Sequence, residues 1–167
     1  VDFCQMPKLE ILDLAACNVR PVFESSICFP DGLKCLHLDG NQLHIDLLQT
    51  PEPFDIDFTS IEKLTIADNS ITGPFRDLFP ENAQFPTLFM FRAARNWLSG
   101  QFAEQLCRAP ALSQLDVSFN DISGRLSECL QQLGPFTLAL FDNNRIEQPL
   151  PVLLAENFCG ECTFFNN

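Results

Sequence analysis

The chain has 167 residues, of which 46% are hydrophobic, and its 22 acidic and 10 basic residues give it a formal net charge of −12. This charge argues against binding to nucleic acid or to an anionic membrane, because both carry the same sign of charge. No apolar run approaches the roughly 20 residues that span a bilayer, so direct membrane insertion is not expected.

An apolar pattern, L-x-x-L-x-L-x-x-N/C-x-L, recurs six times along the chain. The Asn or Cys of each copy marks its place, at Cys17, Asn41, Asn69, Asn96, Asn120 and Asn144. Successive marks are 24, 28, 27, 24 and 24 residues apart, within the about 20–29 residues of this repeat class. The sixth copy has a competing frame through Leu138, Leu140 and Asn143. We prefer the frame of Ala139, Phe141 and Asn144, because Ile146 and Leu150 then occupy apolar positions.

These six copies resemble the leucine-rich repeat family over nearly the whole chain. The resemblance implies an α/β repeat fold: a right-handed curved solenoid with a parallel sheet of short strands on its concave side and loops or 3-10 turns on its convex side. Residues 1–167 are expected to form a single domain of six coils plus partial coils at both ends. Phe3 and Met6 fit the tail of a preceding coil and Phe164 and Asn167 the start of a seventh, so we expect a segment of a longer array.

Three copies continue with a glycine, at Gly73, Gly100 and Gly124, and resemble the plant-type class L-x-G-x-[IFL]. In that class this segment forms a second short strand beside the main sheet. The other three copies carry Pro21, Ile45 and Gln148 at this position, so we expect the second strand to be interrupted at the first, second and sixth coils.

Two sets of apolar residues recur further along each coil and should line the convex side of the core. The first set is Phe23, Leu47, Phe75, Phe102, Leu126 and Leu150, and the second is Ile27, Phe79, Leu106 and Leu130. The longer second and third coils contain proline-rich insertions at 50–57 and 79–86. Because proline cannot donate ladder hydrogen bonds, we expect irregular or single-turn helical connections there.

Eight cysteines favour an oxidising compartment, either extracellular or an organelle lumen. No N-x-[ST] acceptor occurs and the chain begins without a visible signal peptide, so a cytoplasmic location stays open. Cys4 and Cys28 occupy equivalent positions in successive repeats, and Cys107 and Cys129 occupy nearly equivalent positions in two others. Each pair is a candidate disulfide, the alternative being small buried fillers.

Three constellations invite chemical interpretations that the spacing does not favour. Cys159 and Cys162 form a C-x-x-C pair, but zinc needs four ligands, so a local disulfide or end packing is preferred. Cys35, His37 and Asp39 alternate along one strand, too far apart for a catalytic relay, and with Asp13 and Lys63 they indicate a polar contact patch. The acidic residues Asp46, Glu52, Asp55 and Asp57 lack a calcium-loop motif and indicate a solvated face. We expect no metal, no cofactor and no catalytic residues.

The concave face of the fourth to sixth coils is the candidate contact site. Exposed strand positions are normally polar, yet here they combine apolar, aromatic and arginine side chains, the composition of interface hot spots. The candidate residues are Phe89, Met90, Arg92, Arg95, Trp97, Gln114, Asp116, Phe119, Leu138 and Leu140.

The sequence therefore predicts a scaffold that recognises a protein partner without catalysing a reaction. Two versions compete. One is an ectodomain-like binding module, favoured by the cysteines and the plant-type repeats. The other is an accessory or linker subunit of a larger, organellar membrane assembly, favoured by the missing glycosylation acceptors and the uncapped ends.

Overall fold

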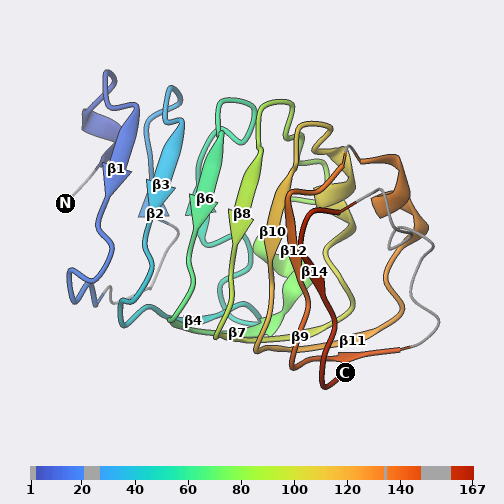
Figure 1. Ribbon diagram of the computed structural model, residues 1–167. Helices are drawn as coiled ribbons and strands as arrows, with labels where there is room; N and C mark the ends of the chain where they lie inside the picture. The colour runs from blue at the N-terminus through green and yellow to red at the C-terminus, as the bar shows by residue number, and fades with distance from the viewer. Residues whose placement is uncertain (1–2, 21–26, 134, 148–158) are drawn as a thin grey trace.

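The computed structural model describes residues 3–20, 27–133, 135–147 and 159–167. Its main element is a seven-stranded parallel sheet in which strands from successive coils lie side by side in chain order (Figure 1). The strands are β1 (Ile11–Asp13), β3 (Cys35–His37), β6 (Lys63–Thr65), β8 (Met90–Arg92), β10 (Gln114–Asp116), β12 (Leu138–Leu140) and β14 (Cys162–Thr163). The predicted leucine-rich repeat solenoid is confirmed.

A second parallel sheet of five strands runs along one edge of the first (Figure 1). It contains β4 (His44–Asp46), β7 (Ser70–Pro74), β9 (Trp97–Gly100), β11 (Asp121–Gly124) and β13 (Arg145–Ile146). The expected interruption at the second and sixth coils was wrong, since β4 and β13 take part. Strand pairing uses backbone groups, and Ile45 supplies these while burying its side chain, 1% exposed. Pro21 and Gln148 lie outside the described residues.

The opposite side of the solenoid consists of 3-10 turns and loops, as expected. The turns are η1 (Phe3–Gln5), η2 (Phe75–Leu78), η3 (Glu104–Arg108) and η4 (Glu128–Gln132). The convex-side positions Leu47, Phe75, Phe102 and Leu126 are buried, as are Phe79, Leu106 and Leu130, and Ile27 is half-buried. Phe23 and Leu150 lie outside the described residues. None of the described helical turns has the length and apolar character to cross a membrane.

The two insertions contribute to the core instead of forming only irregular connections. Part of the first, β5 (Phe54–Asp55), pairs in parallel with β2 (Ile27–Cys28), which corrects the expectation for residues 50–57. The second insertion brings the Phe79 and Phe85 rings edge to face, 5.2 Å between centroids, and Phe58 packs against both. These buried rings fill the additional width of the longer coils.

An asparagine ladder joins every coil to the next. The side chain of Asn96 is typical: its amide nitrogen donates to the carbonyls of Ile66 in the preceding coil (2.9 Å) and Ala93 in its own (3.2 Å). Its oxygen accepts from the backbone nitrogen of Ile71 in the preceding coil at 3.0 Å. The same arrangement recurs at Asn41, Asn69, Asn120, Asn144 and Asn167. Asn167 makes these contacts at the place where the start of a seventh coil is expected.

The ladder also decides the frame of the sixth coil. Asn144 is buried and makes the ladder contacts, whereas its neighbour Asn143 has a positive φ of 55° on the rim. Ala139 and Phe141 face the core at 1% and 2% exposure, and Leu138 and Leu140 are half-buried. The preferred frame is therefore the one the chain adopts.

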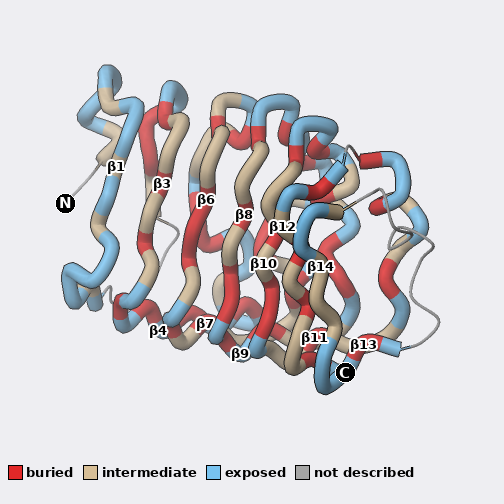
Figure 2. Tube along the Cα trace, viewed as in Figure 1, coloured by how far each residue is buried: buried red, intermediate tan, exposed pale blue. Residues whose placement is uncertain are grey.

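Burial is concentrated between the two sides of the solenoid and decreases in the first coil (Figure 2). Leu12 and Leu14 are half-buried there, whereas their counterparts Leu36 and Leu38 in the second coil are buried. Within the described residues, the strand of the first coil pairs with that of the second coil alone. The burial of a repeat's apolar side chains therefore depends on having a coil on each side.

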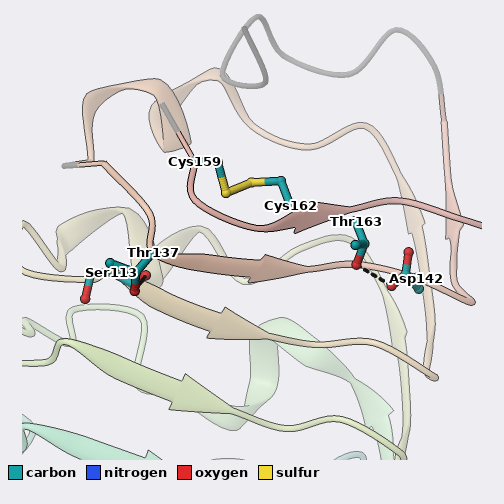
Figure 3. The surroundings of a disulfide bond; sticks show 6 residues. All are labelled: Ser113, Thr137, Asp142, Cys159, Cys162 and Thr163. Atoms are coloured by element: carbon teal, nitrogen blue, oxygen red, sulfur yellow. Dashed lines mark hydrogen bonds between the residues drawn. A yellow bond between two sulfur atoms is a disulfide. The ribbon is translucent and has the colours of Figure 1, made fainter. Parts of the chain in front are cut away.

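Three disulfides lie on the described chain, at the candidate positions. Cys4 pairs with Cys28 and Cys107 with Cys129, each joining two consecutive coils. Cys159 pairs with Cys162 where the chain enters β14, beside the hydrogen bond from Thr163 to the Asp142 carboxylate (Figure 3). Cys17 and Cys35 are free thiols.

The ladder predicts a large effect for a single amide. Asn96→Ala should lower the free energy of unfolding by roughly 2–4 kcal/mol, because buried backbone groups of two coils lose their partners at once. Asn82→Ala, at an exposed asparagine of the second insertion, is the matched control and should change it by less than about 0.5 kcal/mol. Urea unfolding measures both, and equal midpoints for the two variants would contradict the role of the ladder.

Candidate functional site

Six of the ten candidate contact residues lie in two rows across three neighbouring strands. Register partners make the first row Met90, Gln114 and Leu138, and the second row Arg92, Asp116 and Leu140. The residue between the two rows in each strand is buried in the core: Phe91, Leu115 and Ala139. Alternation along a strand then directs both rows to the outer face of the sheet, where all six side chains are half-buried.

Arg95 and Phe119 extend this face along its rim. Each follows its strand in the left-handed conformation, with φ of 54° and 55°, so the two occupy equivalent places in successive coils. The Arg95 guanidinium lies over the Phe119 ring, 4.4 Å from its centroid, and also 3.7 Å from the Asp68 carboxylate. Phe119 remains 43% exposed. An aromatic ring carrying a cation on a solvent-facing rim is a suitable contact for a partner surface.

Phe89 immediately precedes β8 and is half-buried. The Lys63 ammonium lies 5.3 Å from the centroid of its ring. Sequence reasoning placed Lys63 in a separate polar patch, whereas the structure connects it to the apolar residues. Alignment of the repeats could have shown this proximity, because Lys63 is the register partner of Met90.

Trp97 stands apart from the two rows. It begins β9, in the five-stranded sheet, where it pairs with Thr72, and it is 67% exposed. It therefore flanks the contact face from the other sheet. Among the ten candidate residues, nine lie on the face or rim of the seven-stranded sheet and Trp97 adds an aromatic contact beyond the turn.

The alternating residues Cys35, His37 and Asp39 have other partners than one another. The Nδ1 atom of His37 lies 3.0 Å from the Thr65 hydroxyl in the next coil. The Asp39 carboxylate accepts a hydrogen bond from the backbone nitrogen of Ala67 at 2.6 Å. Burial raises the pKa of the Cys35 thiol, which keeps it protonated at neutral pH and a poor nucleophile. Cys35, His37 and Asp39 therefore do not form a hydrogen-bonded relay with one another.

The acidic residues considered for calcium do not converge. Asp57 accepts hydrogen bonds from the Thr59 backbone and hydroxyl and from the Ser60 hydroxyl, and the Thr59 hydroxyl is the main cause that lowers the pKa of this carboxyl. Asp46 accepts from the backbone nitrogen of Leu48. Within the described ranges, no three His, Cys, Asp or Glu side chains are grouped to hold a metal ion.

Comparison with known proteins supports the assignment of the fold. The chain is similar to a plant ice-binding protein, with 21% identity and a TM-score of 0.53, over 96% of this chain and 59% of that protein. It is also similar to a chain of the BIR3–SERK2 complex from Arabidopsis thaliana (18% identity, TM-score 0.49, 92% and 68% covered). A third similar structure is internalin C2 from Listeria monocytogenes (17% identity, TM-score 0.47, 93% and 80% covered).

At these identities the similarity concerns the fold alone, and the chain spans about three fifths of the ice-binding protein. No curated protein sequence matches the chain at a significant level. The model of the Leucine Rich Repeat family matches residues 111–133, within the fifth copy of the pattern. The other coils repeat this unit with the same strand, and all but the first, which has Cys17, carry the ladder asparagine, so the chain has the fold of a leucine-rich repeat solenoid.

Proposed function

We propose that the chain is a non-catalytic protein-recognition module whose partner seats on the face formed by the fourth to sixth coils. This contact face consists of Phe89, Met90, Arg92, Arg95, Trp97, Gln114, Asp116, Phe119, Leu138 and Leu140. One observation carries the proposal: apolar side chains stand on the solvent side of a parallel sheet in adjacent coils. Leaving them uncovered forgoes the free energy of burial, which a partner's surface recovers on binding.

The composition of the contact face supports protein as the partner class. Exposed Trp97 and Phe119 supply large rigid contact area, and Arg95 is already stacked on one of them. Tryptophan and arginine are enriched in the few residues that supply most interface energy. The sheet beneath is held by buried side chains, so these contacts are presented on a preorganised support.

The three disulfides favour an extracellular or lumenal protein, and hence an ectodomain-like module, because disulfides persist mainly in oxidising compartments. The alternative of an accessory subunit within a larger assembly retains one supporting observation, the absence of any N-x-[ST] acceptor. The two versions use the same contact face and differ in what surrounds it.

Removing the apolar part of the face should abolish capture of the partner. Phe89→Ser/Met90→Ser is expected to weaken binding by at least about 100-fold, since two half-buried anchors lose their apolar contacts. Proteins retained from an extract of the native source are compared by quantitative mass spectrometry. Met6→Ser/Leu48→Ser is the matched control, because both side chains are exposed and lie off the contact face. If both double variants retain the same proteins as the wild type, the site is refuted.

The oxidising compartment predicts the thiol content of the protein taken from its native source. Alkylation under denaturing, non-reducing conditions should modify only Cys17 and Cys35, the two cysteines outside the three disulfides. Alkylation after reduction should modify all 8 cysteines and serves as the control. Modification of most cysteines without reduction would exclude the secreted and lumenal versions.

A further inference from the structure

The carboxylates on the solvent face of the seven-stranded sheet already have donors within the chain. Asp13 accepts from the Ala15 backbone at 3.0 Å and Asp39 from the Ala67 backbone. Asp116 accepts from both the nitrogen and the hydroxyl of Ser118, at 3.1 and 2.7 Å, and Asp142 accepts from the Phe165 backbone and the Thr163 hydroxyl. Asp13 and Asp116 thus hold the turn after their own strands, and Asp39 and Asp142 bond to the next coil, so these four carboxylates already have donors.

The cationic side chains at the centre of the same face, Lys63 and Arg92, differ from these aspartates because they have no ion-pair partner among the described residues. The ion pairs of the described residues join Lys34 to Glu10, Arg76 to Asp77, Arg95 to Asp68 and Arg145 to Asp121. Lys63 and Arg92 belong to none of them, although they come from neighbouring strands β6 and β8. A protein of charge −12 therefore keeps two cationic side chains without an ion pair on neighbouring strands, two register positions apart.

The guanidinium of Arg92 leaves most of its hydrogen-bond donors without an acceptor in the described part of the chain. In the described part of the chain its guanidinium makes one hydrogen bond, a long one of 3.4 Å from Nη2 to the Gln114 side chain. Its Nε atom is buried and has no acceptor there, the only such buried side-chain atom among the described residues. Asp116, its register partner, is held by Ser118 instead. A small rotation of the guanidinium toward an incoming acceptor would therefore exchange a poor contact for a good one.

We propose that the partner recognised by the contact face is an extended peptide segment carrying an acidic side chain, and that Arg92 receives this carboxylate. This proposal rests on the proposed function and names the chemistry of its partner. The guanidinium fork matches a carboxylate with two parallel hydrogen bonds, stronger than the neutral bond to Gln114 that they replace. Lys63 adds a second positive charge one strand away, next to the Phe89 ring.

The register of the strands also predicts how far an apolar residue of the peptide should lie from its acidic residue. Arg92, Asp116 and Leu140 are successive partners, so Arg92 and Leu140 are two strands apart, about 10 Å at about 4.8 Å per strand. An extended peptide advances about 3.3 Å per residue, so one crossing the strands reaches Leu140 about three residues after Arg92. The segment should therefore combine an Asp or Glu with an aliphatic or aromatic residue about three positions away.

The overall charge limits how acidic the segment can be. Each further carboxylate meets the field of a chain with charge −12, and Asp116 stands between the two anchor points. We therefore expect one acidic residue in an otherwise neutral, apolar segment, not a polyacidic tract.

Selection from a displayed library of random 12-residue peptides, fused at their C-terminus so that carboxylates come from side chains, tests the proposal. Wild-type protein should enrich peptides with one Asp or Glu about three residues from an apolar residue. Arg92→Met should lose the acidic preference while keeping the apolar one. Arg125→Met, an equal charge change at an exposed arginine beyond β11, is the control and should select as the wild type does.

The best wild-type peptide is then compared with its Gln or Asn counterpart by fluorescence anisotropy. The amide should bind the wild type at least about tenfold more weakly and bind Arg92→Met equally well. Circular dichroism and the melting temperature establish that each variant is folded. Wild-type selection without acidic enrichment, or an unchanged acidic preference in Arg92→Met, would overturn the inference and leave the contact face intact. If the wild type enriches nothing beyond Phe89→Ser/Met90→Ser, the proposed function fails as well.

Discussion

The asparagine ladder is the interaction on which the rest of the structure depends. Each ladder amide bonds backbone groups of its own coil and of the coil before it, so it sets both the turn after the strand and the stacking of neighbours. A buried backbone group without a partner is costly, and the chain leaves the strand at the same point in every coil. With that point held constant, the register of the seven-stranded sheet follows over its whole length.

A constant register converts sequence positions into rows on the outer face. Residues at equivalent positions of successive coils become neighbours about 4.8 Å apart, although they are more than 20 residues apart in the chain. This is why Met90, Gln114 and Leu138 form one row and Arg92, Asp116 and Leu140 the next. The core beneath them tolerates coils of different length, because inserted phenylalanines such as Phe85 pack inward. Variation of coil length therefore does not disturb the contact face.

The chemistry of the face depends on which charges the chain itself compensates. Aspartates at the strand ends accept hydrogen bonds from the following turn, and Arg95 is held by Asp68 and Phe119. Among the described residues neither Arg92 nor Lys63 forms an ion pair; the Arg92 Nε atom has no acceptor, and Lys63 lies over the Phe89 ring. A solenoid that is acidic overall thus has a local region suited to an anion, and such local differences determine which partner can bind.

The sequence by itself determined the repeat, the residues that face the core, the ladder asparagines and the cysteine positions that could pair. All of these features recur with the length of one coil, and such a periodicity is visible in a single chain. It also located the candidate face at Phe89, Met90 and their neighbours, although their role in binding stays a prediction. Only the tertiary structure decided that β4 and β13 complete the second sheet, that residues 54–55 form a strand and that Lys63 meets Phe89. These outcomes depend on backbone pairing and side-chain direction between coils. A pattern specifies which residues face outward, but whether Arg92 finds a carboxylate depends on rotamers that neighbouring coils select together.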